Sequence, residues 1–270
     1  MNGVRANRFA QAFALVFALF MMGCWGKKAD LAGLPHEHEI KLGDLHIQSD
    51  LEIDEHDPLL EELRDLRTEI VDLLNLPTPN RPVVVYLFGD VQRYRDYMNR
   101  THPNLPARRA FFIGTPTELG VYAHWSEQVG EDLRHEYTHG ILHASLRSVP
   151  LWLDEGLAEY FETQSLDAQR RHPEHMQRIS LAIKNGWRPD LERLEQIESV
   201  NEMQRSDYQE AWAWIHYLLH DAPDGRTLLI EYCKTLQKSD KPPRFASLLK
   251  DYFPDADVRL TSYLTFTLVE

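Results

Sequence analysis

The sequence predicts an α+β fold, in which a first lobe of mixed strands and helices precedes a mainly helical second lobe. Two observations predict it: compact β-branched and aromatic runs are concentrated before Gly130, and apolar residues at helical spacing dominate after it. The composition, with 43% hydrophobic and 26% charged residues, is typical of a globular chain with a full core. We therefore expect one domain, with an α/β lobe at 40–130 and a helical lobe at 131–270.

The 40–130 lobe shows strand and helix patterns in turn. Leu45–Leu51 alternates apolar and polar residues, and Val83–Phe88 is a compact apolar run closed by a Gly-Asp pair. Pro58–Leu76 carries apolar residues at helical spacing and ends before Pro77. The elements expected here are strands at Leu45–Leu51, Val83–Phe88, Ala110–Ile113 and Leu119–Trp125, and helices at Pro58–Leu76 and Val91–Arg100.

The 131–270 lobe shows helical spacing almost throughout. Pro150 interrupts the pattern early and separates its first two helices. The helices expected here are Glu131–Ser148, Leu153–Thr163, Glu174–Asn185, Ser206–His220 and Thr227–Leu236.

The chain is acidic, with 29 Lys and Arg residues against 42 Asp and Glu residues and a formal net charge of −13. Such a surface repels phosphate backbones, so we expect no nucleic-acid partner. The two cysteines, Cys24 and Cys233, are too few for a disulfide framework.

The N-terminus reads as an export signal over residues 1–24. Arg5 and Arg8 precede an almost unbroken apolar run, Phe9–Met22, and a small residue follows it before Cys24. The apolar run is shorter than the roughly 20 residues that a membrane-spanning helix needs.

The end of this signal, Met21–Cys24, resembles a bacterial lipobox, with Met21 where the motif usually has Leu. The resemblance implies that Cys24 carries lipid and becomes the mature N-terminus. We therefore expect an exported protein of the cell envelope, a membrane-anchored lipoprotein facing the periplasm or the exterior, with a tether at 25–39. A soluble secreted form and a retained anchor are the alternatives.

The principal chemical motif is His135-Glu136-Tyr137-Thr138-His139, which matches H-E-x-x-H. On a helix, His135 and His139 lie one turn apart on the same face, about 6 Å along the axis, so both imidazoles can bind one ion. Glu136 is rotated by about 100° and can reach a metal-bound water without displacing it. The alternative is a polar stripe on an amphipathic helix.

A zinc site needs a third ligand, and the nearest histidine does not supply it. His143 lies about 12 Å of helix from His135, too far for bonds of about 2.1 Å to one ion. The longer motif H-E-x-x-H-x-x-G-x-x-H also fails, because Leu142 and Ser145 occupy its Gly and last His positions. We expect His143 to lie in the wall of the site.

A second segment, Leu151–Gly156, follows the break at Pro150. Asp154 is expected to cap the next helix, and Glu155 and Glu159 then share one face of it. The short link to the first helix predicts a helical hairpin that directs Glu155 toward the histidines.

This segment, Leu-Trp-Leu-Asp-Glu-Gly, resembles the Trp-Leu-Asn-Glu-Gly segment of the aminopeptidase N family of gluzincin peptidases. The resemblance implies a thermolysin-like fold with the H-E-x-x-H helix at the lobe boundary, and one Zn²⁺ held by His135, His139 and Glu155. It also implies that Glu159 orients a ligand histidine, the alternative being a solvated helix charge. The spacing of about 15 residues more closely resembles the bacterial peptidase MA-like domains.

A third segment, Tyr208–Leu218, resembles the aminopeptidase pattern Tyr-x-x-Gly-x-Ala-x-x-x-Tyr-Leu, with Ala211 in place of Gly. The resemblance implies that Tyr208 hydrogen-bonds the oxyanion of the tetrahedral intermediate. The alternative is a core-facing aromatic. We expect Trp212 and Trp214 to be core residues.

The motif Gly-x-Met-Glu-Asn, which binds the free amine of aminopeptidase substrates, is absent. We expect the corresponding strand to be Leu119–Trp125, lying beside the metal and able to pair with an extended peptide. Nothing in this segment selects an N-terminus, so aminopeptidase activity is not implied.

The sequence therefore predicts a zinc-dependent peptidase that acts on peptide or protein substrates, with zinc activating a water molecule and Glu136 as general base. The alternatives are a non-catalytic zinc-containing envelope lipoprotein that binds peptides or partners, a structural envelope protein with a chance motif, and hydrolysis of a non-peptide amide.

Overall fold

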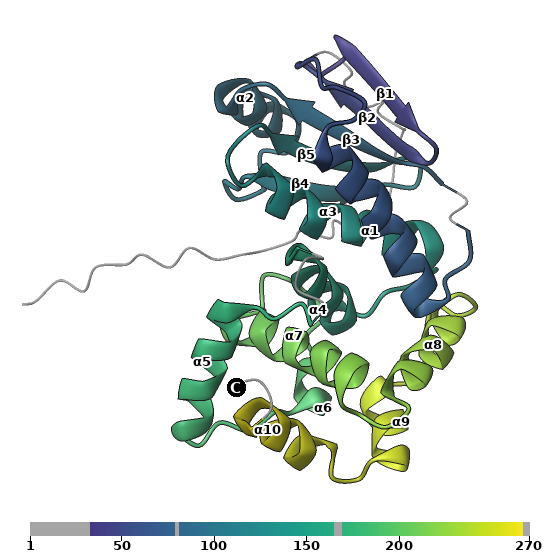
Figure 1. Ribbon diagram of the computed structural model, residues 1–270, viewed down its shortest axis with the longest axis vertical. Helices are drawn as coiled ribbons and strands as arrows, with labels where there is room; N and C mark the ends of the chain where they lie inside the picture. The colour runs from purple at the N-terminus through teal and green to yellow at the C-terminus, as the bar shows by residue number, and fades with distance from the viewer. Residues whose placement is uncertain (1–32, 79–80, 165–168, 267–270) are drawn as a thin grey trace, which may run out of the picture.

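The computed structural model describes residues 33–78, 81–164 and 169–266, and shows a mixed α+β fold (Figure 1). The predicted signal at 1–24, with Cys24, and most of the predicted tether lie outside the described residues. A single sheet with flanking helices forms one lobe, and a group of helices forms the other.

The sheet has five strands in the order β1-β2-β3-β5-β4. The strands are β1 (His38–Leu42), β2 (Leu45–Ser49), β3 (Val83–Phe88), β4 (Ala110–Gly114) and β5 (Leu119–His124). The central pairs β2–β3 and β3–β5 are parallel, and the outer pairs β1–β2 and β4–β5 are antiparallel. The sequence did not predict β1, which begins inside the segment expected to be a tether.

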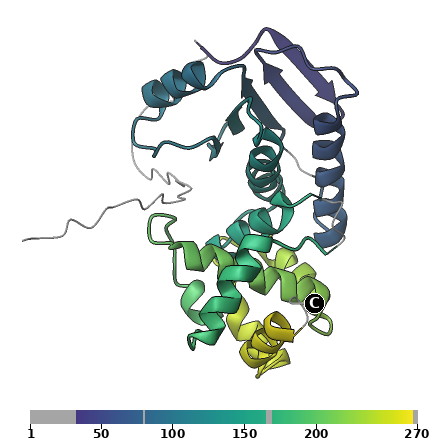
Figure 2. The same ribbon diagram turned by 60° about the vertical axis from the view of Figure 1, so that its left-hand side comes forward.

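Helices cover both faces of this sheet (Figure 2). On one face lie α1 (Pro58–Leu74) and α3 (Val129–Ser145), and on the other lies α2 (Val91–Thr101). The α3 helix packs very close to the sheet at Gly140. A Cβ atom at this position would lie only 2.6 Å from Cγ1 of Val83. This close packing fixes the helix that carries the H-E-x-x-H motif.

The second lobe is built around α4 (Leu151–Glu162) and α7 (Arg205–His220), which pack against each other at Gly156 (Figure 1). A Cβ atom on Gly156 would lie 2.7 Å from the carbonyl oxygen of Ala211. The remaining helices are α5 (Pro173–Lys184), α6 (Leu191–Leu194), α8 (Gly225–Leu236), α9 (Phe245–Tyr252) and α10 (Ala256–Phe266). The sequence did not predict α6, α9 or α10.

The N-terminus of α4 differs from the expectation. The helix begins at Leu151 rather than Leu153, and its N-cap is Pro150, whose ψ of 141° is extended. Asp154 therefore lies inside the first turn and does not cap the helix, which leaves its carboxylate available for contacts with α3.

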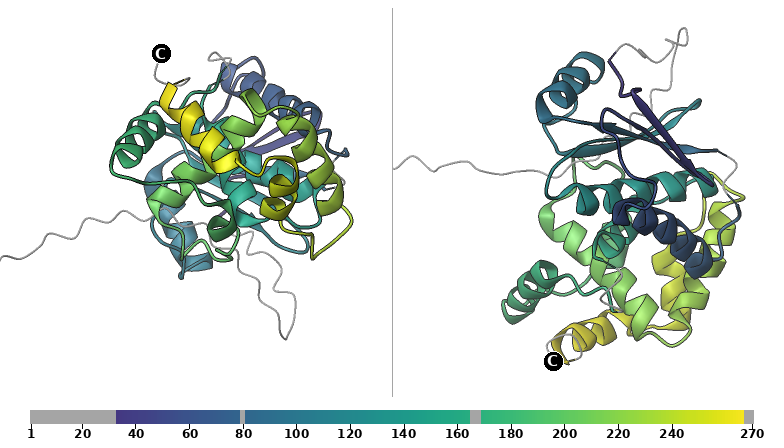
Figure 3. Two further views of the ribbon diagram at one scale, coloured as in Figure 1. Left: turned by 90° about the horizontal axis from the view of Figure 1, so that it is seen from below. Right: turned by 45° about the horizontal axis from the view of Figure 1, so that its top comes forward.

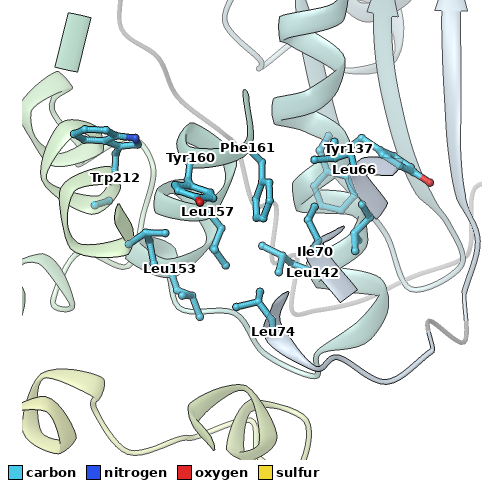
Figure 4. Close-up of a cluster of buried hydrophobic side chains, with 14 of the residues drawn as sticks. Leu66, Ile70, Leu74, Tyr137, Leu142, Leu153, Leu157, Tyr160, Phe161 and Trp212 are labelled. Carbon is cyan, nitrogen blue, oxygen red and sulfur yellow. The ribbon is translucent and has the colours of Figure 1, made fainter. Parts of the chain in front are cut away.

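One apolar core joins the two lobes. It runs from α1 through α3 and α4 to α7 (Figure 4). The residues labelled there are Leu66, Ile70, Leu74, Tyr137, Leu142, Leu153, Leu157, Tyr160, Phe161 and Trp212. Trp212 and Trp214 are both buried, as predicted. In the right-hand view of Figure 3, the helices of the second lobe lie on the same side of the sheet as α3. Among the described residues, none of the helices is both long and apolar enough to cross a membrane.

Candidate metal centre

The packing of α4 on α3 brings together three side chains that the motifs singled out. Nε2 of His135 lies 3.8 Å from Oε2 of Glu155, and Nε2 of His139 lies 3.9 Å from the same oxygen. Two atoms that each bind zinc at about 2.1 Å with tetrahedral geometry are about 3.4 Å apart. Both distances are therefore close to the separation that one zinc ion requires, and the ligand atoms of all three residues lie within 4.8 Å of one another.

Three polar atoms at this place are buried without a hydrogen-bond partner among the described residues. They are Nε2 of His139 and both carboxylate oxygens of Glu155. Both side chains are completely buried. Burying a carboxylate without a partner is expensive, and a bound cation removes that cost. The donor set of two imidazoles and one carboxylate also matches zinc chemistry, so these residues fit a zinc ion.

Each of the two histidines donates a hydrogen bond to a carboxylate through Nδ1. Nδ1 of His135 donates to Oε2 of Glu162 at 2.9 Å, and Nδ1 of His139 donates to Oδ1 of Asp154 at 2.8 Å. Nε2 of each ring then faces Glu155, and it offers a lone pair there once the ring is neutral. Such carboxylate contacts are usual for histidines that bind metal, because they fix the tautomer and the ring orientation.

The resemblance implied that Glu159 orients a ligand histidine, and this was wrong. Glu159 instead accepts a hydrogen bond from Nε2 of His175 at 2.7 Å, and Glu162 takes the predicted role. Both carboxylates lie on the Glu155 face of α4, one and two turns further on, so helical spacing would have allowed either. The solvated-charge alternative for Glu159 was also wrong, because the side chain is buried.

The pKa values follow from burial and from these ion pairs. Burial raises the pKa of Glu155 to about 7. Burial alone would lower the pKa of His135, but the Glu162 carboxylate outweighs it and raises the pKa to about 10. The pKa of Asp154 falls, because its contacts with His139 and His143 outweigh its burial. In the metal-free protein, protons on the histidines therefore balance part of the carboxylate charge.

Glu136, the predicted general base, lies beside this group on α3 and is 5% exposed. Its Oε2 accepts a hydrogen bond of 2.6 Å from the backbone N–H of Phe112 in β4. A sequence motif cannot predict this contact, because its donor is a backbone N–H, which every residue except proline has. It holds one carboxylate oxygen of Glu136 and fixes the direction of the other.

The strand beside Glu136 is not the one that was expected. Peptide pairing was expected at Leu119–Trp125, but β5 in that segment is already paired on both sides, with β3 and with β4. β4 forms the edge of the sheet, and its Phe112 contacts Glu136. Any peptide that extends this sheet on the metal side would therefore pair with β4.

Tyr208 lies in the first turn of α7 and is buried. Burial raises its pKa, the negative charge of Glu155 raises it further, and Arg108 acts in the opposite direction. The hydroxyl group therefore lies within the electrostatic field of the centre.

His143 is not part of the candidate ligand set, as expected. Its Nε2 donates to the second oxygen of Asp154 at 2.9 Å, and its ring stacks on Phe112 with centroids 5.3 Å apart. It thus helps to hold the carboxylate that orients His139.

A family model described as a protein of unknown function, DUF1570, matches residues 132–243, the part of the chain that contains the centre and Tyr208. No curated protein matches the sequence. A similar solved structure is that of a mutant M1 zinc metallopeptidase from Deinococcus radiodurans, described as bound to a Tyr-Ser-Ala substrate. The identity is 18% and the TM-score 0.45, and the similarity covers 86% of this chain and 50% of that one. The chain thus spans about half the length of that peptidase.

Proposed function

We propose that this protein is a zinc-dependent peptidase whose metal ligands are His135, His139 and Glu155. The observation that carries the proposal is the convergence of their ligand atoms, two of which, Nε2 of His139 and Oε2 of Glu155, are buried without a hydrogen-bond partner among the described residues. A buried group of this kind is poorly explained as a structural feature, because an apolar residue at Glu155 would avoid the cost of burying its charge.

A zinc ion held by His135, His139 and Glu155 would supply a Lewis acid that activates water and polarises the scissile carbonyl group. Glu136 accepts the proton of the attacking water through the oxygen that Phe112 does not hold, and later delivers it to the leaving amine. The Phe112 N–H keeps the carboxylate in one orientation, so little rearrangement is needed during proton transfer.

Two further parts of the site have roles in this proposal. Tyr208 donates a hydrogen bond to the oxyanion of the tetrahedral intermediate, and its raised pKa keeps the phenol protonated for that purpose. The β4 edge binds the substrate backbone in an extended form, which places a peptide bond beside Glu136.

The test uses the chain from residue 25 onward, loaded with zinc. The wild type and Glu136→Gln digest an unbiased peptide mixture side by side, and mass spectrometry identifies the products. We expect cleavage by the wild type alone, with equal zinc content in both proteins. Equal cleavage by both would contradict the role of Glu136. If neither cleaves while zinc stays bound at one per chain, the non-catalytic envelope lipoprotein is favoured instead.

We also propose export and lipid attachment at Cys24, on the lipobox resemblance alone. Metabolic labelling with a fatty acid should mark the wild type and not Cys24→Ala. Labelling of neither protein would leave secretion or a retained anchor as the explanation of the N-terminal segment.

A further inference from the structure

Two carboxylates of α4 and two imidazoles of α5 form a pair of parallel contacts, which we call the His–Glu ladder. His172 donates through Nε2 to Oε1 of Glu162 at 2.8 Å, and His175 donates through Nε2 to Oε2 of Glu159 at 2.7 Å. The carboxylates are three residues apart on one helix, and the histidines are three residues apart at the start of the other. The ladder therefore docks the N-terminus of α5 on α4.

The two contacts are alike in their surroundings. The imidazole rings of His172 and His175 stack with centroids 3.6 Å apart and planes within 8°. The side chains in the two contacts are 8–17% exposed. The ring of Trp212 from α7 lies in a T-shaped arrangement with both rings, with centroids 6.4 Å from His172 and 5.5 Å from His175. The two histidines differ in one structural respect, because His172 is also the N-cap of α5 and its Nδ1 accepts from the backbone N–H of His175.

Only one of the two contacts is hydrogen-bonded to a candidate zinc ligand, although a carboxylate oxygen of Glu159 also lies within 4.8 Å of a ring nitrogen of His135. The second oxygen of Glu162 accepts from Nδ1 of His135 at 2.9 Å, so Glu162 joins His172 to a candidate zinc ligand. The other contact ends at Glu159 and His175, and Nδ1 of His175 has no hydrogen-bond partner among the described residues. The ladder thus contains a connected histidine and a matched unconnected one.

The protons along the connected contact are determined by its hydrogen bonds. Nδ1 of His172 accepts from the backbone N–H of His175 at 3.3 Å, so the ring proton lies on Nε2 and points at Glu162. Glu162 then accepts on both oxygens, which requires His135 to donate through Nδ1. The Nε2 lone pair of His135 is left for the metal.

We propose that His172 is a positioning residue for the metal centre, which holds Glu162 so that Glu162 fixes the tautomer and the orientation of His135. The inference rests on the proposed zinc site. It goes beyond that site in assigning a role to a side chain that touches neither the metal ligands nor the general base.

A second metal ion is the other use to which this cluster could be put. Ligand atoms of Glu159, His172 and His175 lie within 4.8 Å of one another. Two imidazoles that bind one ion direct their lone pairs toward a common point, whereas the lone pairs of stacked rings lie in two nearly parallel planes and do not meet at one point. The observed rings therefore suit hydrogen bonding to two carboxylates and not a shared ion.

The experiment measures the zinc dissociation constant by competition with a chelator, together with the number of zinc ions per chain. His172→Leu removes the donor to Glu162 and should weaken zinc binding about tenfold, the lower end of the effect of such outer contacts. His172→Gln keeps an amide donor at the same reach and should restore most of the affinity. The matched control, His175→Leu, should lower the melting temperature and leave the zinc affinity within about twofold of the wild type.

The outcomes separate the inference from the proposed function. Equal loss of zinc affinity in both leucine variants would overturn the inference, because the ladder would then act only as a structural clamp. Two zinc ions per wild-type chain, with one lost in His175→Leu, would replace it with a second metal site. Absence of zinc binding by the wild type would overturn the proposed centre and the inference with it. If the leucine variants do not fold, His172→Asn, whose amide is one methylene too short to reach Glu162, replaces the leucine in the comparison with His172→Gln.

Discussion

Replacing Glu155 by Gln should make the metal-free protein more stable at neutral pH and remove its affinity for zinc. Glu155 is completely buried, and neither of its oxygens has a hydrogen-bond partner among the described residues. Burial raises its pKa from the ordinary value of 4.5 to about 7. The unfolded chain therefore ionises this group at lower pH than the folded protein does.

The magnitude follows from the two pKa values. As the pH rises from 4.5 to 7, the unfolded state loses a proton that the folded state keeps, so the free energy of unfolding decreases. Each pH unit of this interval costs about 1.4 kcal/mol, which gives about 3 kcal/mol in total. Glutamine does not titrate, so Glu155→Gln should gain about 2–3 kcal/mol relative to the wild type between pH 5 and pH 8.

Urea unfolding at pH 5 and pH 8, with a chelator present, measures this change. The cost of burying the glutamine amide is the same at both pH values and cancels in the comparison. The exposed Glu127 supplies a control, because Glu127→Gln should show no such pH dependence. With zinc added, the wild type should become more stable than Glu155→Gln, because only the wild type gains binding energy. A stability difference between Glu155→Gln and the wild type that does not change with pH would refute the reasoning.

Four more predictions concern the centre. Gly156→Ala places a Cβ atom 2.7 Å from a backbone oxygen of α7, and should lower the free energy of unfolding by about 1–3 kcal/mol and weaken zinc binding. The pKa of His135 is about 10 because Glu162 outweighs burial, so zinc affinity should rise from pH 6 to pH 9, with proton release detectable by calorimetry in different buffers. Tyr208→Phe should lower kcat by about 10²–10³ and leave zinc affinity unchanged. Phe112→Pro removes the N–H of the edge strand that donates to Glu136. It should lower kcat about tenfold or more, with full zinc content.

Each of these has a clear contrary result. Wild-type stability in Gly156→Ala would mean that α4 and α7 are less closely packed than described. Zinc affinity that does not depend on pH would exclude protonated histidines in the metal-free centre. Unchanged turnover in Tyr208→Phe or Phe112→Pro would remove that residue from the proposed mechanism.

The fold could be predicted where the residues of a helix or strand are themselves apolar and buried. Val83–Phe88 is almost entirely buried, and its apolar run identified it as a strand. β1 was missed because only Ile40 of its five residues is buried, so its conformation depends on pairing with β2 rather than on its own sequence. The four-residue α6 is too short to show a helical period.

The candidate site could be predicted only in part, for a related reason. The local motifs on α3 and α4 carry His135, Glu136, His139 and Glu155, and the structure brings the proposed ligands together. Glu162 was missed because choosing between it and Glu159 needs the docked position of α5, which local spacing does not contain. The strand beside Glu136 was also misassigned, because the order of strands in the chain does not give their order in the sheet.

Anomalous diffraction at the zinc edge, from crystals of the zinc-loaded protein, would locate the metal ion. We expect one peak within bonding distance of Nε2 of His135, Nε2 of His139 and Oε2 of Glu155. A peak between Glu159 and the α5 histidines alone, or no ordered peak in protein that contains zinc, would contradict the proposed centre.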